Sequence, residues 1–300
     1  MQKIEVLAAN NWKDYELIDS GDSAKLERFG PYIFVRPEHQ AVWPKALPAQ
    51  QWDAAHAFFQ ATAGEETGGR WFQNRPVPEN WPLRYRNLLF KARFTASRHL
   101  GVFPEQAVHW DWIANQIHAV QRPVKVLNLF GYTGLATLAA VQAGAEVTHV
   151  DAAKKSIGWA RENQDLSKLV DRPVRWIVDD ALKFVHREAR RSSLYDGIIL
   201  DPPKFGRGPK GEVWEFFELL PELLNSCAAV LNPKPLFLVI TAYAIRASAL
   251  SLFYAVQEQF KVLQGEFACG ELAVQERNAK RMISLAIFSR WSSQDVSSRS

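Results

Sequence analysis

The sequence predicts an α/β protein with a doubly wound, mostly parallel sheet and an antiparallel C-terminal strand, preceded by a small β-rich domain. Three observations lead to this prediction. From residue 124 onward, short β-branched runs alternate with helical stretches, which is the pattern of βαβ units. Residues 14–44 instead alternate short apolar runs with turn-rich pieces, as in a small β unit. The last apolar run, 282–291, follows the helical stretches and is expected to pair antiparallel at the edge of the sheet.

The individual elements follow from periodicity and from turn residues. A helix is expected over 52–62, a long surface loop rich in Gly, Pro, Asn and Trp over 63–82, a strand over 88–95 and a helix over 104–119. Parallel strands are expected at 124–130, 146–151, 174–178, 197–200 and 236–241, with helices between them and a further strand at 260–268. The predicted domains are therefore a β-rich unit with its loop, 1–82, a second domain, 83–291, that begins with a basic ribbon, 83–103, and a flexible tail, 292–300.

Composition disfavours disordered, membrane-spanning and metal-binding proteins. The chain has 300 residues, of which 47% are hydrophobic and 23% charged, as in a folded globular protein rather than a disordered one. No apolar run is long enough to span a membrane and the first residues do not resemble a signal peptide, so a cytoplasmic protein without a membrane partner is expected. The two cysteines have no ligand neighbours at metal-binding spacing, so no metal is expected. No sequence feature indicates an oligomeric state.

The net charge of +4 permits a nucleic-acid partner without establishing one. Between residues 84 and 98, basic side chains alternate with aromatic ones and no acid intervenes, a mixture that suits phosphates and stacked bases. A two-stranded ribbon with one solvated basic face explains the same residues equally well. The basic residues are Arg84, Arg86, Lys91, Arg93 and Arg98.

Three strand ends carry residues suited to a nucleoside ligand. Residues 126–134 predict a buried strand that runs into a glycine turn and then a helix, where a ligand can approach the backbone and the free N–H groups of the helix. The turn lacks the G-x-G-x-x-G spacing of dinucleotide sites, and alone it could be an ordinary strand-to-helix turn. Asp151 ends the next strand and can accept both ribose hydroxyls. Asp179 or Asp180 could accept an adenine amino group, although capping the next helix is the alternative for both.

The fourth strand ends in the most specific segment, Leu200-Asp201-Pro202-Pro203-Lys204-Phe205. Two successive prolines fix the backbone and remove two N–H donors, which leaves a stiff turn whose carbonyl groups are expected to face the reacting group. Asp201 can accept a hydrogen bond or a proton, and Phe205 can stack on a base. A rigid turn without function is the alternative, and the preceding ligand features in the expected order make it weaker.

From about Arg98 to Trp291 the chain resembles class I S-adenosylmethionine-dependent methyltransferases, which have a Rossmann-like fold. Within that class it is most similar to bacterial large-subunit ribosomal RNA methyltransferases that form 5-methylcytosine or 7-methylguanine. The shared motifs are N-x-F-x-Y-T-G after the first strand, an acid ending the second, a D-D turn and D-P-P-x-F. The matching residues are Asn128, Phe130, Tyr132, Thr133, Gly134, Asp151, Asp179, Asp180 and Asp201 to Phe205.

The resemblance implies an enzyme that uses S-adenosylmethionine and acts on RNA. The implied cofactor-binding residues are Phe103, Gln106, Asn128, Phe130, Gly131, Tyr132, Thr133, Gly134, Asp151, Ala152, Asp179, Asp180 and Ala181. Phe103 and Gln106 belong to a segment, 101–106, that is similar to a family motif lying over the cofactor. The implied catalytic residues are Asp201, Pro202, Pro203 and Phe205, with Lys204 and Arg207 binding substrate phosphates from the loop 206–211. A solvated surface loop explains 206–211 equally well.

One departure from the family pattern concerns the reaction. The 5-methylcytosine enzymes carry a cysteine nucleophile just after the fifth strand, whereas residues 239–246 contain none. We therefore expect methylation of a nitrogen or oxygen by direct displacement. The alternatives are a methyltransferase of a small molecule or protein and a non-catalytic RNA-binding protein with this fold. An NAD-dependent dehydrogenase is disfavoured by the missing glycine fingerprint.

Overall fold

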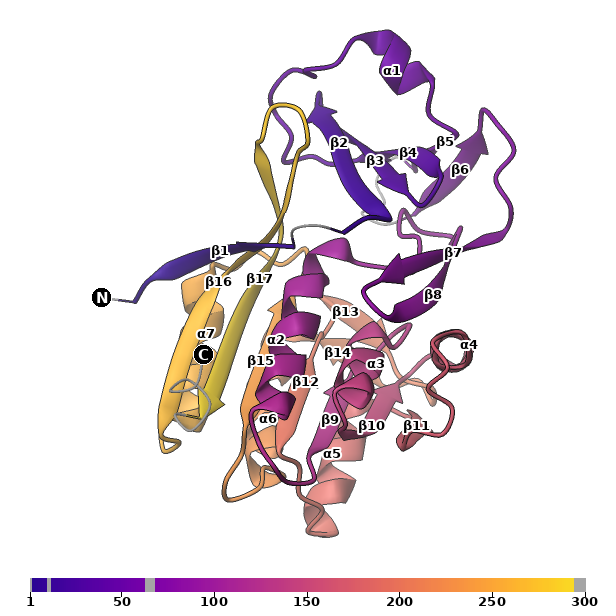
Figure 1. Ribbon diagram of the computed structural model, residues 1–300. Helices are drawn as coiled ribbons and strands as arrows, with labels where there is room; N and C mark the ends of the chain where they lie inside the picture. Colours follow the sequence, from indigo (N-terminus) through magenta and orange to yellow (C-terminus); the bar gives the residue numbers. More distant parts are fainter. Residues whose placement is uncertain (1, 10–11, 63–67, 294–300) are drawn as a thin grey trace. The chain divides into compact units, whose positions relative to one another are not determined.

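The computed structural model describes residues 2–9, 12–62 and 68–293, and the chain forms two compact units (Figure 1). The first unit comprises Met1–Leu7, Ala107–Leu272 and Leu285–Ser300, and the second comprises Ala8–Gln106 and Ala273–Ser284. In this division residues 83–106 group with the N-terminal strands, while the domain limits 1–82 and 83–291 stay a prediction. From residue 294 onward the predicted tail lies outside the described residues.

An eight-stranded sheet organises the first unit, in the order β1-β16-β17-β15-β12-β9-β10-β11. Its five parallel strands are β9 (Lys125–Leu129), β10 (Glu146–Asp151), β11 (Val174–Val178), β12 (Gly197–Leu200) and β15 (Phe237–Ala242), and β17 (Met282–Ser293) pairs antiparallel with β15. The predicted fold class is confirmed. The strand order reverses between β9 and β12, and ligands of open α/β sheets bind outside the carboxyl ends of the strands at such a point.

Helices cover both faces of this sheet (Figure 1). The helices α5 (Ala181–Arg190), α6 (Phe216–Ala229) and α7 (Ala249–Phe260) pack on the side where Leu127, Leu129 and Ile198 are fully buried or nearly so. The helices α2 (Ala107–His118), α3 (Leu135–Gln142) and α4 (Lys154–Leu166) contact the other side. Burying each Leu or Ile side chain stabilises the fold by about 1.5–3 kcal/mol, so this double layer fixes the strand ends that carry the motifs.

The second unit is built from a five-stranded sheet and a separate hairpin. The sheet order is β2-β3-β4-β5-β6, with β4 and β5 parallel and the other pairs antiparallel. The strands are β2 (Tyr15–Gly21), β3 (Ala24–Phe29), β4 (Tyr32–Pro37), β5 (Ala57–Ala61) and β6 (Gly69–Gln73), and the hairpin pairs β7 (Asn80–Tyr85) with β8 (Leu88–Arg93). Arg84, Lys91 and Arg93 share the hairpin face opposite its buried face, as the ribbon alternative predicted.

Three predicted elements differ in the structure, and one strand of the N-terminal region joins the other sheet. The predicted helix 52–62 is a short α1 (Ala49–Asp53) followed by β5, because side chains of β5 alternate between buried and exposed as a strand requires. The predicted loop 63–82 contains β6 and the start of β7, while residues 63–67 lie outside the described residues. The predicted strand 260–268 starts late: Phe260 ends α7, and β16 spans Gly265–Gln275. The strand β1 (Ile4–Ala8) belongs to the large sheet rather than to the N-terminal strands.

The predicted helix 104–119 is divided into two pieces in the structure. It consists of a 3₁₀ turn, η1 (Pro104–Gln106), followed by α2. No described helix is long and apolar enough to cross a membrane.

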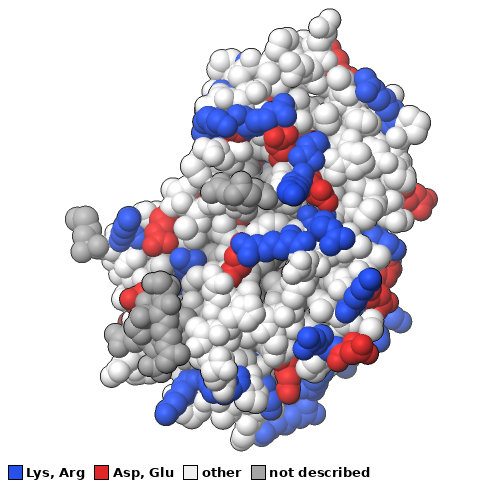
Figure 2. Space-filling view, viewed as in Figure 1, with Lys and Arg blue, Asp and Glu red and all other residues white. Residues whose placement is uncertain are grey.

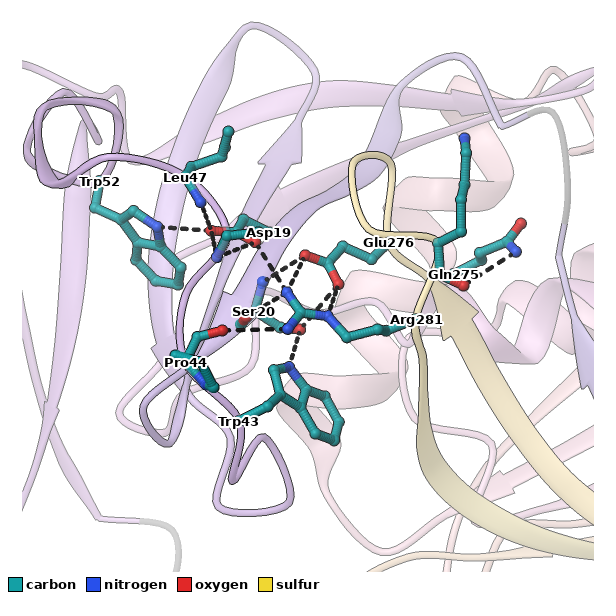
Figure 3. A network of polar contacts seen from close by, with 11 residues as sticks. Asp19, Ser20, Trp43, Pro44, Leu47, Trp52, Gln275, Glu276 and Arg281 are labelled. Atoms are coloured by element: carbon teal, nitrogen blue, oxygen red, sulfur yellow. Dashed lines mark hydrogen bonds and ion pairs between the residues drawn. The ribbon is translucent and has the colours of Figure 1, made fainter.

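The tip of the β16–β17 hairpin joins the second unit through buried charges (Figure 3). Arg281 donates through Nε and Nη2 to the carboxylate of Glu276, at 2.7 and 2.8 Å, and it also reaches the Ser20 carbonyl at 3.1 Å. Asp19 accepts from the indole of Trp52 at 3.0 Å, and both Asp19 and Glu276 have an exposed fraction of 0%. Because an unpaired buried charge costs about 3–5 kcal/mol, these groups hold the hairpin tip in one position.

Candidate functional site at the carboxyl ends of the parallel strands

The turn after β9 has an unusual backbone. Phe130, Tyr132 and Gly134 all have positive φ, at 58°, 48° and 83°. The Gly131 N–H donates to the Val150 carbonyl at 3.1 Å, and the Gly134 N–H donates to the Gly131 carbonyl at 3.0 Å. Gly134 is the N-cap of α3 and has no side chain that could accept a hydrogen bond. The first N–H groups of α3 therefore have no side-chain cap.

A buried polar chain supports this turn from beneath. The Asn128 amide donates to the Thr137 hydroxyl at 2.8 Å, and that hydroxyl lies 2.9 Å from Nδ1 of His149. A Cβ atom on Gly131 would lie 2.3 Å from Cε1 of His149, closer than atoms can approach. The glycine is therefore required by the imidazole below it. Asn128, which the sequence assigned to the cofactor, is 2% exposed and takes part in this support.

Asp151 stands at the end of β10 beside the turn. Its carboxylate accepts the N–H of Tyr132 at 2.9 Å and that of Ala153 at 2.8 Å, while Ala152 lies half-buried between them. Burial raises the pKa of Asp151, against the lowering effect of these two hydrogen bonds. Burial and the neighbouring Asp151 charge raise the pKa of Tyr132 to about 12. The two backbone donors thus fix the carboxylate at the mouth of the glycine turn.

The acidic pair after β11 has structural partners. Asp180 is the N-cap of α5 and accepts the Lys183 N–H at 2.9 Å, which is the capping alternative. Asp179 accepts from its neighbour's N–H and from the Arg187 guanidinium, at 3.0 and 2.6 Å. Ala181 is buried in the core. Both carboxylates still lie at the carboxyl edge of the sheet, next to the Asp151 strand.

A tryptophan that lies outside the recognised motif holds the proline turn after β12. The indole N–H of Trp214 donates to the Pro203 carbonyl at 2.6 Å, and its ring packs on Phe130 with centroids 5.0 Å apart. This carbonyl therefore already accepts one hydrogen bond within the chain, and its expected orientation toward the reacting group stays a prediction. Trp214 is 3% exposed and joins the two turns; no local pattern marks it, since the contact depends on the hairpin that follows. The Asp201 N–H meets the Leu129 carbonyl at 3.4 Å.

The segment after the prolines is a small hairpin, β13 (Phe205–Arg207) paired with β14 (Val213–Glu215), where the sequence predicted a loop. Phe205 is 55% exposed, and Lys204 and Arg207 are also exposed. Glu212 folds back to accept from Lys183 of α5 at 2.6 Å. The hydrogen bond from Lys183 lowers the pKa of Glu212 to about 2. The hairpin is thereby tied to the helix that follows Asp179.

Two predicted cofactor residues lie elsewhere in the chain. Phe103 and Gln106 belong to the second unit, Gln106 as the last residue of η1, and Phe103 packs on His99 with ring centroids 4.7 Å apart. Their proposed contact with a cofactor stays a prediction. Among the described residues no cluster of His, Cys, Asp and Glu could hold a metal ion.

Comparison with known proteins identifies the family. A family model described as S-adenosylmethionine-dependent methyltransferase matches residues 36–239. The crystal structure of a SAM-dependent methyltransferase from Agrobacterium tumefaciens is 48% identical, with a TM-score of 0.92 and 97% of each chain covered. SMU.776, described as a methyltransferase and solved with S-adenosylhomocysteine (SAH), shares the fold at a TM-score of 0.70 and 16% identity, over 93% of this chain and 75% of the other.

Part of the chain is also similar to a ribosomal RNA methyltransferase. Ribosomal RNA large subunit methyltransferase K/L of Shewanella sp. (strain ANA-3) is 38% identical over 90 residues, or 29% of this chain. The match spans 13% of that relative's length.

Proposed function

Because the chain belongs to the S-adenosylmethionine-dependent methyltransferase family, we propose that it methylates a nitrogen or oxygen of an RNA base, with ribosomal RNA as the substrate class. S-adenosylmethionine is the cofactor, and it supplies a methyl group already activated on a sulfonium sulfur. The chain then has to hold the acceptor lone pair in line with that methyl group and take up the proton that the acceptor loses. The observation that carries the proposal is the placement of both cysteines.

Neither cysteine can act as the thiolate that carbon methylation of a pyrimidine requires. Cys227 lies in α6 with an exposed fraction of 0%, packed in the core, and burial raises the pKa of its thiol strongly. Cys269 lies in β16, also 0% exposed, and burial raises its pKa too. The sequence contains no third cysteine. A nitrogen or oxygen acceptor needs no such nucleophile, because its own lone pair attacks.

The residues around the glycine turn fit the cofactor. A fixed carboxylate at a strand end can accept ribose hydroxyls, and uncapped N–H groups at the start of a helix can donate to a carboxylate. Asp151 supplies the first and α3 the second. Asn128 and Ala181 act from below by keeping the turn and α5 in place. The binding surface is assigned to Phe130, Gly131, Tyr132, Thr133, Gly134, Asp151, Ala152, Asp179 and Asp180.

The proline turn is assigned to the acceptor. Asp201 hydrogen-bonds an amino group of the base and receives its proton, while Pro202, which is buried, and Pro203 keep the carboxylate in place. Phe205 is exposed enough to stack on the base. Lys204 and Arg207 are exposed cations beside it and contact phosphates.

The relative's ribosomal name and these cations favour RNA over a small molecule or protein. Figure 2 shows Lys and Arg side chains in several groups on one face, with Asp and Glu among them rather than apart. Because charges of both signs are interspersed, this surface favours RNA binding through individual side-chain contacts over binding through one strongly positive electrostatic potential. Salt-sensitive RNA binding distinguishes an RNA methyltransferase from the alternatives.

The decisive experiment identifies the methylated nucleoside. The purified chain is incubated with isotopically labelled S-adenosylmethionine and ribosomal RNA that lacks its natural methylation, and the digested RNA is analysed by mass spectrometry. We expect label in an N- or O-methylated nucleoside, a large loss with Asp201→Asn, and retention with the double variant Cys227→Ala/Cys269→Ala. Labelled 5-methylcytosine or 5-methyluridine would overturn the nitrogen or oxygen assignment. Label in protein or small molecules, with none in RNA, would overturn the substrate class.

A further inference from the structure

The hairpin of β13 and β14 carries Phe205 and Arg207, two residues assigned to the acceptor, and it is too small to keep a fixed position by itself. Each strand has three residues, and the two form a sheet of their own. Phe205 and Val213 are 55% and 53% exposed on its outer face. Because a lone two-stranded hairpin is marginally stable in water, contacts at its two ends have to hold it.

The base of the hairpin is held next to the proline turn. Trp214, on the inner face of β14, is 3% exposed and donates to the Pro203 carbonyl at 2.6 Å. The Phe216 N–H donates to the Lys204 carbonyl at 3.1 Å, at the point where β14 continues into α6. The tip of the hairpin, residues 208–212, lies at the other end of the strands and needs an anchor of its own.

Glu212 links the tip to α5. Its carboxylate accepts from Nζ of Lys183 at 2.6 Å through Oε1 and from the Lys210 N–H at 2.8 Å through Oε2. The Gly208 N–H donates to the Glu212 carbonyl at 2.8 Å, which closes the turn. The Glu212 side chain is 9% exposed, against 59% for that of Lys183. The carboxylate therefore lies inside the tip and connects it to the helix.

Lys183 lies beside the acidic turn that follows β11. It belongs to the first turn of α5, and its own N–H donates to the Asp180 carboxylate at 2.9 Å. The hydrogen bond to Glu212 and the charges of Glu212, Asp180 and Asp179 raise the pKa of Lys183. Acidic groups of the chain already complement this ammonium group, which argues against a role in binding substrate phosphates. Its position instead joins the hairpin to the acidic turn.

We propose that Lys183 and Glu212 are positioning residues, whose ion pair holds the hairpin so that Phe205 and Arg207 meet the acceptor nucleotide in one orientation. This inference rests on the proposed function. An exposed ion pair adds little to overall stability, so its loss should leave the fold intact and release the tip. A displaced acceptor reacts more slowly even when it is bound, because in-line transfer requires a fixed distance and angle. The pair should therefore affect kcat more than KM.

Methylation kinetics of the full chain, with ribosomal RNA that lacks its natural methylation, test the pair. Glu212→Ala and Lys183→Met should each lower kcat about fivefold and change KM for the RNA by less than about twofold. The double variant should lose no more than Glu212→Ala alone, because both changes remove the same contact. Lys183→Arg keeps a donor for the carboxylate and should restore the wild-type kcat. SAH affinity should stay within about twofold of the wild type in every variant.

Limited trypsin digestion reports on the tip without any substrate. Trypsin can cut after Arg207 and Lys210, and mass spectrometry gives the rate of each cleavage. Glu212→Ala should speed both cleavages about fivefold, because the tip opens more easily. Lys261→Met is the matched control, since Lys261 and Glu258 form an exposed ion pair at the end of α7, with side chains 61% and 70% exposed. This control should keep the wild-type kcat and the wild-type cleavage rates.

The outcomes separate the positioning role from the proposed function. Wild-type kcat in Glu212→Ala, or unchanged cleavage at the tip, would overturn the positioning role while methylation of RNA stands. Additive losses in the double variant would also overturn it, because the two residues would then act separately. If the wild type labels no RNA, the proposed function falls, and the digestion alone decides whether the pair anchors the hairpin. A loss of SAH affinity in Glu212→Ala would assign Glu212 to the cofactor side instead.

Discussion

The glycine turn after β9 and the proline turn after β12 end neighbouring parallel strands, yet they are held in different ways. The glycine turn is supported from beneath by a polar chain of Asn128, Thr137 and His149, which come from β9, α3 and β10. The proline turn is held from the side by Trp214, a residue of the hairpin that follows it. The first support comes from three successive elements of the chain, and the second is a single side chain.

This difference suggests a division of tasks between the turns. The polar chain is fully buried and cannot shift without leaving a donor or acceptor unpaired, so the turn that we propose for the cofactor is rigid. The hairpin that carries Trp214 exposes Phe205 and Arg207, so the turn that we propose for the acceptor can differ between proteins that keep the same glycine turn. Damage to each turn should then affect different measurements.

The largest effect is expected from Gly131→Ala. The new Cβ would lie 2.3 Å from Cε1 and 2.6 Å from Nδ1 of His149, and that imidazole is fixed by Thr137. Relieving this overlap costs about 1–3 kcal/mol and displaces the turn. SAH binding, measured by calorimetry, should fall more than tenfold, and the unfolding free energy should fall as well.

Gly158→Ala is the control for added volume. Gly158 is exposed in α4, and a Cβ there would meet nothing within 4 Å. The variant should keep SAH affinity and gain about 0.5–1 kcal/mol of stability from helix propensity. Wild-type SAH binding by Gly131→Ala would show that the turn tolerates the imidazole's displacement, and the rigid support would be refuted.

A paired indole replacement tests the division directly. Trp214→Phe removes the donor to the Pro203 carbonyl but keeps a ring against Phe130, and an unsatisfied carbonyl costs about 1–3 kcal/mol. Methylation of RNA should slow about tenfold, with SAH affinity within about twofold of the wild type. Trp176→Phe loses a bond to Gln164 and alters the ring packed on His149 at 4.7 Å, so SAH affinity should be the quantity that falls. Equal losses of SAH affinity in both variants would show that the turns act as one unit.

The sequence predicted the parallel strands and both turns because their signals are local. β10, β11 and β12 begin and end where β-branched runs do, and the glycine and proline residues mark the turns within a few positions. Trp214 could not be predicted, since its contact with Pro203 depends on the β13–β14 hairpin closing over eleven positions. The same applies to Gly131. A side chain there would collide with His149 on the neighbouring strand, and that contact cannot be read from the local sequence.

The N-terminal strands were predicted less well for a related reason. The segment 52–62 has helix-forming residues, but the sheet imposes an alternation in which Phe59 is buried and Phe58 is not. Glu276 and Arg281 complete a cluster with Asp19 from the opposite end of the chain, and no local pattern announces such a pairing. Sequence patterns thus fail to predict the structure where it depends on contacts between residues that lie far apart in the chain.

At neutral pH the smallest effect on stability is expected at two buried histidines of the first unit, one with a hydrogen-bond partner among the described residues and one without. Burial lowers the pKa of both His149 and His109 from 6.5 to about 3. Each is neutral in the folded state and takes up a proton on unfolding below pH 6.5, so stability is full above that pH and declines as the pH falls toward 3. Each histidine contributes about 1.4 kcal/mol per pH unit to this decline.

The two histidines differ in their hydrogen bonds. Within the described residues neither ring nitrogen of His109 has a hydrogen-bond partner, whereas Nδ1 of His149 meets Thr137. His109→Leu should therefore keep the stability and SAH affinity at neutral pH and reduce the acid slope of unfolding by about 1.4 kcal/mol per pH unit. His149→Leu should reduce the slope equally but weaken SAH binding. If both variants bind SAH as the wild type does, the cofactor turn does not need the imidazole, and Asn128 and Thr137 suffice to hold it.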